Sequence, residues 1–369
     1  MFGWLDSGNF PIGVDIGAQA VRLLQFRPAR DGLALQAAAR IDRAGLPEGG
    51  ADIRALARAI RDTIVGGTFR GRRCVLAFSP SLIHSRSVRL PPMPDHDLAQ
   101  AMQWEVKDRF GFDPDPGSVA FFRAGEVRRG TETREELLMF AAAPALLRAH
   151  LEAFMAAGLR VPAIDLQACA LLRALTREPS PPPVDPAQPV SEAVLDIGST
   201  GTQLIIHQAG RLVFYKYVEI GAVALDTVVA QKLGVSPAEA AQMRDRLGRA
   251  EDQAESSDIP AALAQAVGDA LRPKLDELSR ELDMCMRYHV ITFRASRPEV
   301  LHVVGRQAQH DRMHESLAGL LGLRVETAQP LRGVTGLTEA TRPDRSGEWA
   351  VASGLALYPV KKAAAEAAA

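Results

Sequence analysis

The sequence predicts a mixed α/β protein built from two related halves. A strand–turn–strand pattern containing the tripeptide Asp-Ile-Gly occurs twice, and apolar segments of strand and helix type alternate along the chain. Residues 178–189 contain six prolines and separate the two halves. Proline removes backbone donors and fixes extended geometry, so we expect a linker here.

Each copy of the repeated pattern consists of an apolar strand, Asp-Ile-Gly, a tight polar turn and a second apolar strand. The copies lie at residues 12–26 (with Asp15 and Gly17) and 194–207 (with Asp196 and Gly198), and turn signals follow at 30–32 and 208–211. The two copies are about 180 residues apart, whereas solenoid repeats have periods of roughly 20 to 50 residues. The pattern therefore predicts a duplicated domain.

Hydrophobic periodicity predicts the remaining elements. Strands are expected at 74–78, 87–90, 137–142 and 300–304, and helices at 53–65, 97–110 and 145–157, with a helix start at 236–239 and a long amphipathic helix at 263–292. Pro273 is expected to break or kink the long helix. This alternation favours a helix-covered sheet in each half.

Charge and cysteine content argue against several classes of protein. The chain has 369 residues, and 43 basic against 44 acidic side chains give a net charge of -1, so the totals show no nucleic-acid footprint. The three cysteines are far apart and in no metal-ligand spacing, which indicates a reducing compartment. Residues 1–6 lack the features of a signal peptide, and no apolar run is long enough to span a bilayer. We therefore expect a cytoplasmic protein that reaches the membrane only through a partner.

Two copies of Asp-x-Gly at strand ends have a chemical use when they act together. Glycine lets the backbone approach a phosphate and direct N–H groups at it, and a carboxylate can hold waters on a Mg²⁺ that bridges phosphate oxygens. One copy is a weak signal, and Asp15 and Asp196 as plain turn residues remain an alternative. Neither a P-loop nor a dinucleotide fingerprint is present to compete with this interpretation.

These paired hairpins resemble the two phosphate loops of the actin, sugar-kinase and Hsp70 superfamily. Over nearly its full length the chain is similar to the PilM family of type IV pilus assembly proteins. The similarity rests on the order and spacing of short segments, at residues 13–17, 21–24, 76–83, 89–91, 97–98, 104–105, 110–114, 157–159, 164–165, 170, 173, 220–221, 236–240 and 287–288.

The resemblance implies an actin-like (ribonuclease H-like) duplicated two-lobe α/β fold with an inserted α+β subdomain in the first lobe. The implied boundaries are a first lobe at 1–178 with the insert at about 73–143, a linker at 179–189, a second lobe at 190–345, a C-terminal helix at 346–360 packing back on the first lobe, and a tail at 361–369.

The resemblance also implies ATP and Mg²⁺ as cofactors. The implied contacts are Asp15, Gly17, Ala18 and Gln19 in the first phosphate loop, Asp196, Gly198, Ser199, Thr200 and Thr202 in the second, and Arg244, Gly305 and Arg306 on the nucleoside side. Asp15 and Asp196 would hold the Mg²⁺ through water. Asp165 would help to orient the attacking water and is, with Asp15, the candidate catalytic residue; capping of the following helix is the alternative for Asp165.

The implied partner is the N-terminal peptide of a PilN-type membrane protein, bound in a groove between the two subdomains of the first lobe. Trp104 is the candidate wall residue of that groove, and a core position is its alternative. Pilus motor ATPases are further candidate partners.

The chain departs from the family pattern at three places. Ala18 and Gln19 stand where relatives often carry Ser or Thr. Arg306 follows Gly305 where relatives usually have a glycine pair, so its side chain either blocks the base or stacks on it. Ala241 and Arg244 replace the usual Glu and Lys, and surface charges are the alternative for Arg244 and Arg306. The phosphate half of the site is therefore mostly kept and the nucleoside half is altered.

Three hypotheses follow. The first is a nucleotide-gated scaffold, at most a slow ATPase, because nothing in the sequence supplies a strong general base or an arginine finger. The second is a nucleotide-free scaffold of a pilus or type II secretion system. The third is a small-molecule kinase, for which the sequence has no motif for a substrate-orienting Asp or a sugar pocket.

Overall fold

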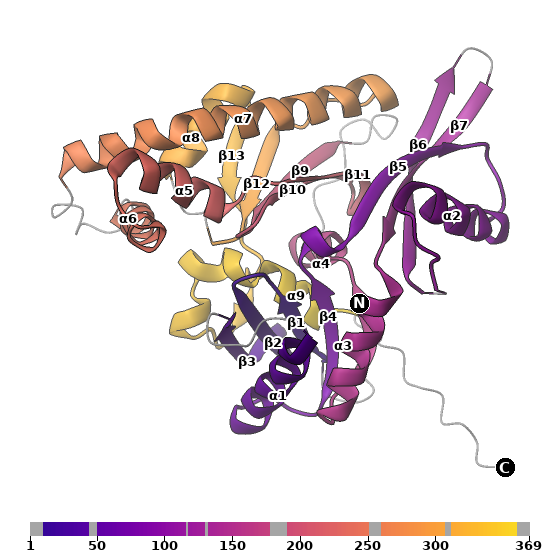
Figure 1. The fold of residues 1–369 in the computed structure, drawn as a ribbon, viewed down its shortest axis with the longest axis horizontal. Helices are drawn as coiled ribbons and strands as arrows, with labels where there is room; N and C mark the ends of the chain where they lie inside the picture. Colours follow the sequence, from indigo (N-terminus) through magenta and orange to yellow (C-terminus); the bar gives the residue numbers. More distant parts are fainter. Residues whose placement is uncertain are drawn as a thin grey trace. The chain divides into compact units, whose positions relative to one another are not determined.

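The computed structural model describes residues 10–43, 50–115, 117–129, 132–177, 190–250, 260–306 and 311–359. The chain divides into two compact units, and Figure 1 labels their elements. The first unit comprises Met1–Ser79, Arg148–Ala174 and Pro330–Ala369, and the second comprises Pro80–Leu147 and Leu175–Gln329. The predicted linker at 179–189 and tail at 361–369 lie outside the described residues.

A six-stranded sheet forms the first unit, in the order β14-β3-β2-β1-β4-β8. Its strands are β1 (Ile12–Ile16), β2 (Ala20–Ala29), β3 (Gly32–Asp42), β4 (Arg73–Phe78), β8 (Arg160–Asp165) and β14 (Val334–Thr335). β1 pairs antiparallel with β2 and parallel with β4. All five residues of β1 are buried, as its apolar sequence predicts for a central strand. The predicted first hairpin is confirmed.

Helices cover both faces of this sheet. They are α1 (Gly50–Gly66), α3 (Pro144–Ala156), α4 (Gln167–Leu175) and α9 (Ala350–Ala356), with 3₁₀ turns at Glu339–Thr341 and Pro343–Trp349. Figure 1 shows α1 and α9 on opposite faces. On the α9 face, Trp349 and Ala352 pack against Leu24 and Phe26 of β2. The helices predicted at 53–65 and 145–157 are confirmed.

A five-stranded sheet of the second unit repeats the strand order of the first, as β11-β10-β9-β12-β13. Its strands are β9 (Ser191–Ile197), β10 (Thr202–Gln208), β11 (Arg211–Val218), β12 (Val300–Val304) and β13 (Arg324–Thr327). β9 pairs antiparallel with β10 and parallel with β12, just as β1 pairs with β2 and β4. The predicted duplication is therefore present in the strand topology as well as in the sequence.

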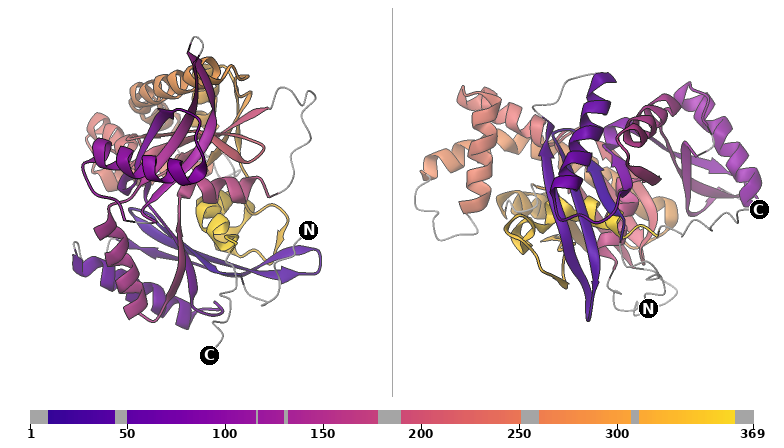
Figure 2. Two further views of the ribbon diagram at one scale, coloured as in Figure 1. Left: turned by 90° about the vertical axis from the view of Figure 1, so that its right-hand side faces the viewer. Right: turned by 90° about the horizontal axis from the view of Figure 1, so that it is seen from below.

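One face of this second sheet packs against long helices. The helices of the unit are α2 (Asp95–Phe110), α5 (Ala222–Leu233), α6 (Pro237–Ala250), α7 (Ala261–Phe293) and α8 (Asp311–Leu321), with a 3₁₀ turn at Pro80–Leu82. Leu278 and Leu282 of α7 and Leu317 of α8 join one core with the sheet. Figures 1 and 2 show the ribbons of these helices alongside it. α7 continues as one helix through Pro273, so the helix is not broken there, and a kink at Pro273 stays a prediction. Pro273 is exposed, and water can satisfy the carbonyl that loses its N–H partner.

The second unit also contains a small antiparallel sheet in the order β5-β7-β6. Its strands are β5 (His84–Leu90), β6 (Val119–Arg129) and β7 (Glu132–Ala141). Leu98, Met102 and Val106 of α2 cover one face of it, as the helical spacing predicts. β4 belongs to the first sheet because it pairs with β1 and β8. The inserted sheet therefore begins after Phe78, later than the expected start near Arg73.

A closed ring of hydrogen bonds joins the inserted sheet to α7. Glu136 of β7 is 1% exposed and accepts bonds from Arg89 Nε (2.6 Å) and Tyr288 Oη (2.7 Å). Arg89 Nη2 also donates to Tyr288 Oη (2.9 Å). Phe140 packs edge-on against Tyr215 beside this ring, with the centroids 4.9 Å apart. These contacts compensate the buried carboxylate and fix the small sheet to the helix. None of the described helices combines the length and hydropathy that a membrane span requires.

We expect Glu136→Ala to destabilise the protein by about 2 kcal/mol, because it removes two charge-assisted hydrogen bonds and leaves Tyr288 Oη without its carboxylate acceptor. Urea unfolding followed by circular dichroism measures the change. Glu132→Ala on the same strand is the control, since its exposed pair with Arg134 (3.3 Å) should contribute less than about 0.5 kcal/mol. Equal effects of the two substitutions would contradict the role assigned to the ring.

Candidate functional site

The first Asp-Ile-Gly hairpin holds a buried carboxylate at the end of β1. Asp15 is 6% exposed, and Gln167 Nε2 donates to its Oδ1 (2.7 Å). Arg22 lies opposite Asp15 in the strand register, with Nη1 4.0 Å from Oδ2. The turn closes through a bond from Gly17 N–H to the carbonyl of Ala20 (3.1 Å). The carboxylate is thereby oriented before any ligand binds.

The second hairpin is built in the same way. Asp196 is 9% exposed, and Gln203, opposite it in the register, donates from Nε2 to Oδ2 (2.8 Å). Tyr215 Oη donates to Gln203 Oε1 (3.3 Å) and so orients the amide. Gly198 N–H bonds to the carbonyl of Gly201 (2.9 Å), the equivalent of the first turn. Both loops therefore combine a fixed carboxylate with a turn of one type.

The tips of the two turns present free backbone donors. The N–H groups of Ala18 and Gln19, and those of Ser199 and Thr200, donate to no other group within the described part of the chain. Successive free N–H groups in a tight turn form a concave surface that suits an anion. The residues present therefore fit phosphate oxygens, and Ala18 does not prevent this because the backbone supplies the donors.

The hydroxyl groups of the second loop differ in availability. Thr202 is fully buried, and its Oγ1 donates to the carbonyl of Ile220 (2.6 Å), so it ties the loop to the segment before α5. Thr200 Oγ1 lies 3.2 Å from Tyr217 Oη. Ser199 Oγ has no partner among the described residues. Ser199 is therefore the hydroxyl on this turn that is freest to meet a ligand.

Asp165 lies at the end of β8 with both carboxylate oxygens engaged. Oδ1 accepts from the N–H of Leu166 (2.9 Å), and Oδ2 accepts from Arg173 Nη2 (2.9 Å). Arg173 also donates to the carbonyl of Gly354 (2.7 Å) and stacks over Tyr358. Asp165 thus helps to join α4 to α9, in addition to any part in catalysis.

Gly305 brings the end of β12 directly onto the second hairpin. Its φ is +94°, in the region that favours glycine. A Cβ atom there would lie 2.7 Å from the carbonyl oxygen of Ile197 and 3.0 Å from Asp196 Oδ1. The structure therefore places this predicted nucleoside contact next to the predicted phosphate loop.

The two arginines of the altered nucleoside half each have an acidic partner. Arg244 is 3% exposed and donates from Nη1 to Asp226 Oδ1 and to the carbonyl of Ala222 (3.2 Å). Burial lowers the pKa of Arg244 and raises that of Asp226, and the ion pair opposes both shifts. Arg306 pairs with Asp245 at an exposed position. A surface position for Arg244 is therefore wrong: its guanidinium holds α6 against α5.

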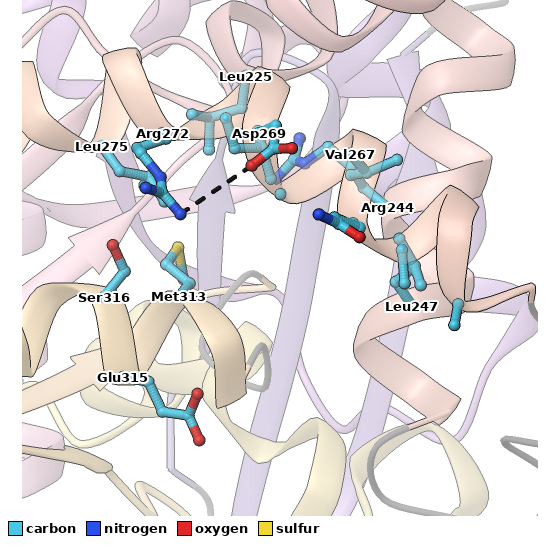
Figure 3. A pocket seen from close by; sticks show the side chains of 15 residues that line it. Leu225, Arg244, Leu247, Val267, Asp269, Arg272, Leu275, Met313, Glu315 and Ser316 are labelled. Atoms are coloured by element: carbon cyan, nitrogen blue, oxygen red, sulfur yellow. Dashed lines mark ion pairs between the residues drawn. The ribbon is translucent and has the colours of Figure 1, made fainter.

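Arg244 also lines an open cavity of about 540 Å³ between α5, α6, α7 and α8 (Figure 3). Polar and apolar groups contribute about equally to its wall. The labelled residues include Leu225, Leu247, Leu275, Met313, Asp269, Arg272 and Glu315. The volume is within the range of small-molecule sites. Gly305 and Arg306 are not among its described walls, so the predicted nucleoside contacts do not all meet in one cavity.

Trp104 is 71% exposed on α2. The helix turns Leu98, Met102 and Val106 towards the inserted sheet, and Trp104 falls between them on another face. The core alternative for Trp104 is therefore wrong, and its role as the wall of a peptide groove stays a prediction.

Sequence reasoning missed the side chains that hold the two carboxylates. Arg22 and Gln203 could be found by counting residues across each turn, because they lie opposite Asp15 and Asp196. Gln167 is 152 residues from Asp15 and carries no local signal beyond its position after Asp165.

Two sheets of one strand order, each opening with an Asp-Ile-Gly hairpin, make this an actin-like protein. The family described as type IV pilus assembly protein PilM matches residues 13–359. The chain belongs to that family.

Solved structures agree with this fold. The chain is 24% identical to the chain it matches in a PilM-PilN type IV pilus biogenesis complex, with 95% of this chain and 98% of that chain covered and a TM-score of 0.72. It is 14% identical to the ethanolamine utilization protein EutJ from Carboxydothermus hydrogenoformans, with 95% and 89% covered and a TM-score of 0.54. No curated protein sequence matches the chain.

We expect Gly305→Ala to destabilise the second unit by about 2 kcal/mol or more, because the new Cβ meets the backbone of Ile197 and the positive φ is strained for alanine. Thermal or urea unfolding measures this. Gly319→Ala is the matched control: Gly319 lies within α8 with open space around it, so alanine should add about 1 kcal/mol of stability. Destabilisation by both substitutions would show that close packing at Gly305 is not the cause.

Proposed function

We propose that this type IV pilus assembly protein is a scaffold that binds ATP and Mg²⁺ and, in response, the N-terminal peptide of a PilN-type membrane protein. The observation that carries the nucleotide part is the matched pair of hairpins, each with a buried carboxylate held by a glutamine amide and a turn with free N–H donors. One such loop is common in proteins. Two on sheets of equal topology are characteristic of a duplicated phosphate site.

Different groups in the two loops would bind the phosphates and the metal ion. The free N–H groups of Ala18, Gln19, Ser199 and Thr200 would donate to phosphate oxygens. The carboxylates of Asp15 and Asp196 would accept from waters on the metal. ATP supplies the phosphate charge and Mg²⁺ the hydrated cation that the two carboxylates prefer.

Turnover in this proposal is slow. Both oxygens of Asp165 are engaged by Arg173 and the N–H of Leu166, so the carboxylate is a poor acceptor for a water proton. The free energy for a conformational change would come from nucleotide binding and not from hydrolysis. A nucleotide shifts the equilibrium between two conformations only as far as its affinities for them differ.

The partner half of the proposal rests on the family and on Trp104. A matching chain was solved in a PilM-PilN complex, and an exposed tryptophan is the kind of anchor that carries binding energy in peptide recognition. Binding a PilN-type peptide would place the protein at the cytoplasmic face of the inner membrane. Motor ATPases would then meet the complex there.

A nucleotide-free scaffold is the second candidate function. The observation in its favour is that Arg244 and Arg306, which replace family residues on the nucleoside side, are already paired with Asp226 and Asp245. A guanidinium held in this way is less available to an adenine base.

Calorimetric titration of ATP with Mg²⁺ tests the nucleotide part. We expect micromolar binding to the natural protein and its loss in Asp196→Ala, because the substitution removes an acceptor for metal-bound water. Asp31→Ala is the control of equal charge change, since Asp31 is an exposed turn residue, and it should bind ATP normally. Absence of binding at millimolar ATP by the folded natural protein would establish the nucleotide-free alternative.

The peptide part is tested by fluorescence titration with a synthetic N-terminal peptide of a PilN-type protein. We expect Trp104→Ala to weaken binding about tenfold, the effect of truncating an interface anchor. Ile291→Ala removes another highly exposed apolar side chain (77% exposed), far along the chain on α7, and should leave the affinity unchanged. Equal affinities for the Trp104 variant and the natural protein would exclude Trp104 from the groove.

A further inference from the structure

A second, smaller cavity lies between the inserted sheet and the end of α7. Its volume is about 240 Å³, and its walls come from β6, the β10–β11 hairpin and the residues that end α7. The lining side chains that the argument uses are Glu126, Gln208, Arg211, His289, Arg294 and Ser296. None of these residues belongs to the proposed nucleotide or peptide site.

One wall of the cavity contains a buried polar side chain with an unused nitrogen. His289 is fully buried, and its Nε2 lies 3.1 Å from Ser191 Oγ. Gln208 Nε2 donates to the same Oγ (3.3 Å). Burial lowers the pKa of His289 to about 4, so the ring is neutral, with one nitrogen protonated and the other an acceptor.

His289 Nδ1 has no hydrogen-bond partner among the described residues. Leaving a buried polar atom unpaired is costly, and in native structures such an atom is usually met by an ordered water, an ion or a ligand. The unpaired nitrogen is thus an independent sign that a hydrogen-bonding group belongs in this cavity.

The remaining walls are rich in donors. Arg211 comes from the start of β11 and donates weakly to Gln208 Oε1 (3.4 Å). Arg294, which ends α7, has no partner in the described part of the chain. Ser296 adds a hydroxyl, and Glu126 is the one carboxylate in the lining. Two guanidinium groups against one carboxylate leave the cavity cationic.

We propose that this cavity binds a small oxyanion ligand, a phosphate ester or carboxylate that also carries a hydroxyl group. Arg211 and Arg294 bind the anionic end, because guanidinium groups match the geometry of such oxygens. Glu126 accepts from the hydroxyl. The volume suits a metabolite of a few carbon atoms, and the lining residues include none of the residues of the ATP site proposed above.

The position of the cavity gives the ligand a structural effect. Gly125 of β6 lies against the ring of Phe293, where a Cβ would approach to 2.9 Å, so strand and helix end already touch at one edge of the cavity. A bound anion would add contacts from β6 to β11 and α7. The ligand is therefore expected to stabilise the docking of the inserted sheet within the second unit.

The test uses inorganic phosphate and malate as probes, titrated by calorimetry into the full chain at constant ionic strength. We expect saturable binding of at least one anion by the natural protein. Arg211→Gln/Arg294→Gln should weaken it by about tenfold or more, the effect of losing charge-assisted bonds. Arg246→Gln/Arg280→Gln makes the same charge change at exposed positions outside the cavity and should leave the affinity unchanged.

The two phosphate loops are a competing site for these probes, and the variants separate the two. Equal phosphate binding by all three proteins would place the anion at the loops and overturn the proposal. The proposal would be overturned as well if neither probe binds up to about 10 mM. A dissociation constant above that concentration corresponds to less than about 3 kcal/mol of binding free energy. If the double variant fails to fold, Arg294→Gln alone provides the comparison, with Arg280→Gln as its control.

Discussion

Two carboxylates at the ends of central strands are the constraint on which this structure depends. Asp15 and Asp196 are almost fully buried, and taking a charge out of water is costly unless hydrogen bonds compensate it. Gln167 and Gln203 supply those bonds, and each glutamine ties another element to the strand. Gln167 begins α4, and Gln203 connects β10 to Tyr215 of β11. Holding the acids in place therefore also holds together the elements around each loop.

Much of the fold could be predicted because its signals are local. Apolar strands around Asp-Ile-Gly predict the hairpins, and the spacing of apolar positions predicts the helices. The matching strand orders of the two sheets depend on pairing between distant segments, which one sequence does not reveal. Pro273 shows how context overrides propensity. The sequence predicts a break or a kink there, and exposure on a helix packed along its other face lets α7 continue unbroken.

The residues of the candidate site also fall into two groups, those with a local sequence signal and those without one. The acids and glycines of both loops are visible in the sequence because the turn itself requires them. Their partners Gln167 and Asp226 are not, because side chains so far apart in sequence meet only after folding. Arg244 shows the consequence most clearly. When its pairing with Asp226 is not known, Arg244 is expected at the surface, where such long cationic side chains usually lie. The fold instead buries Arg244 in an ion pair with Asp226.

Arg244 and Arg306, the two arginines at the predicted nucleoside contacts, both have acidic partners. A buried guanidinium without a partner would be strongly destabilising, so Arg244 depends on Asp226, and Arg306 is likewise matched by Asp245. Each of these two arginines is thus compensated by an acidic partner. Gly305 has the positive φ and the missing Cβ that let the chain after β12 lie directly against Asp196. If the nucleotide site proposed above exists, a kept glycine at this position and an acidic partner for each arginine indicate a site that is reshaped rather than abandoned.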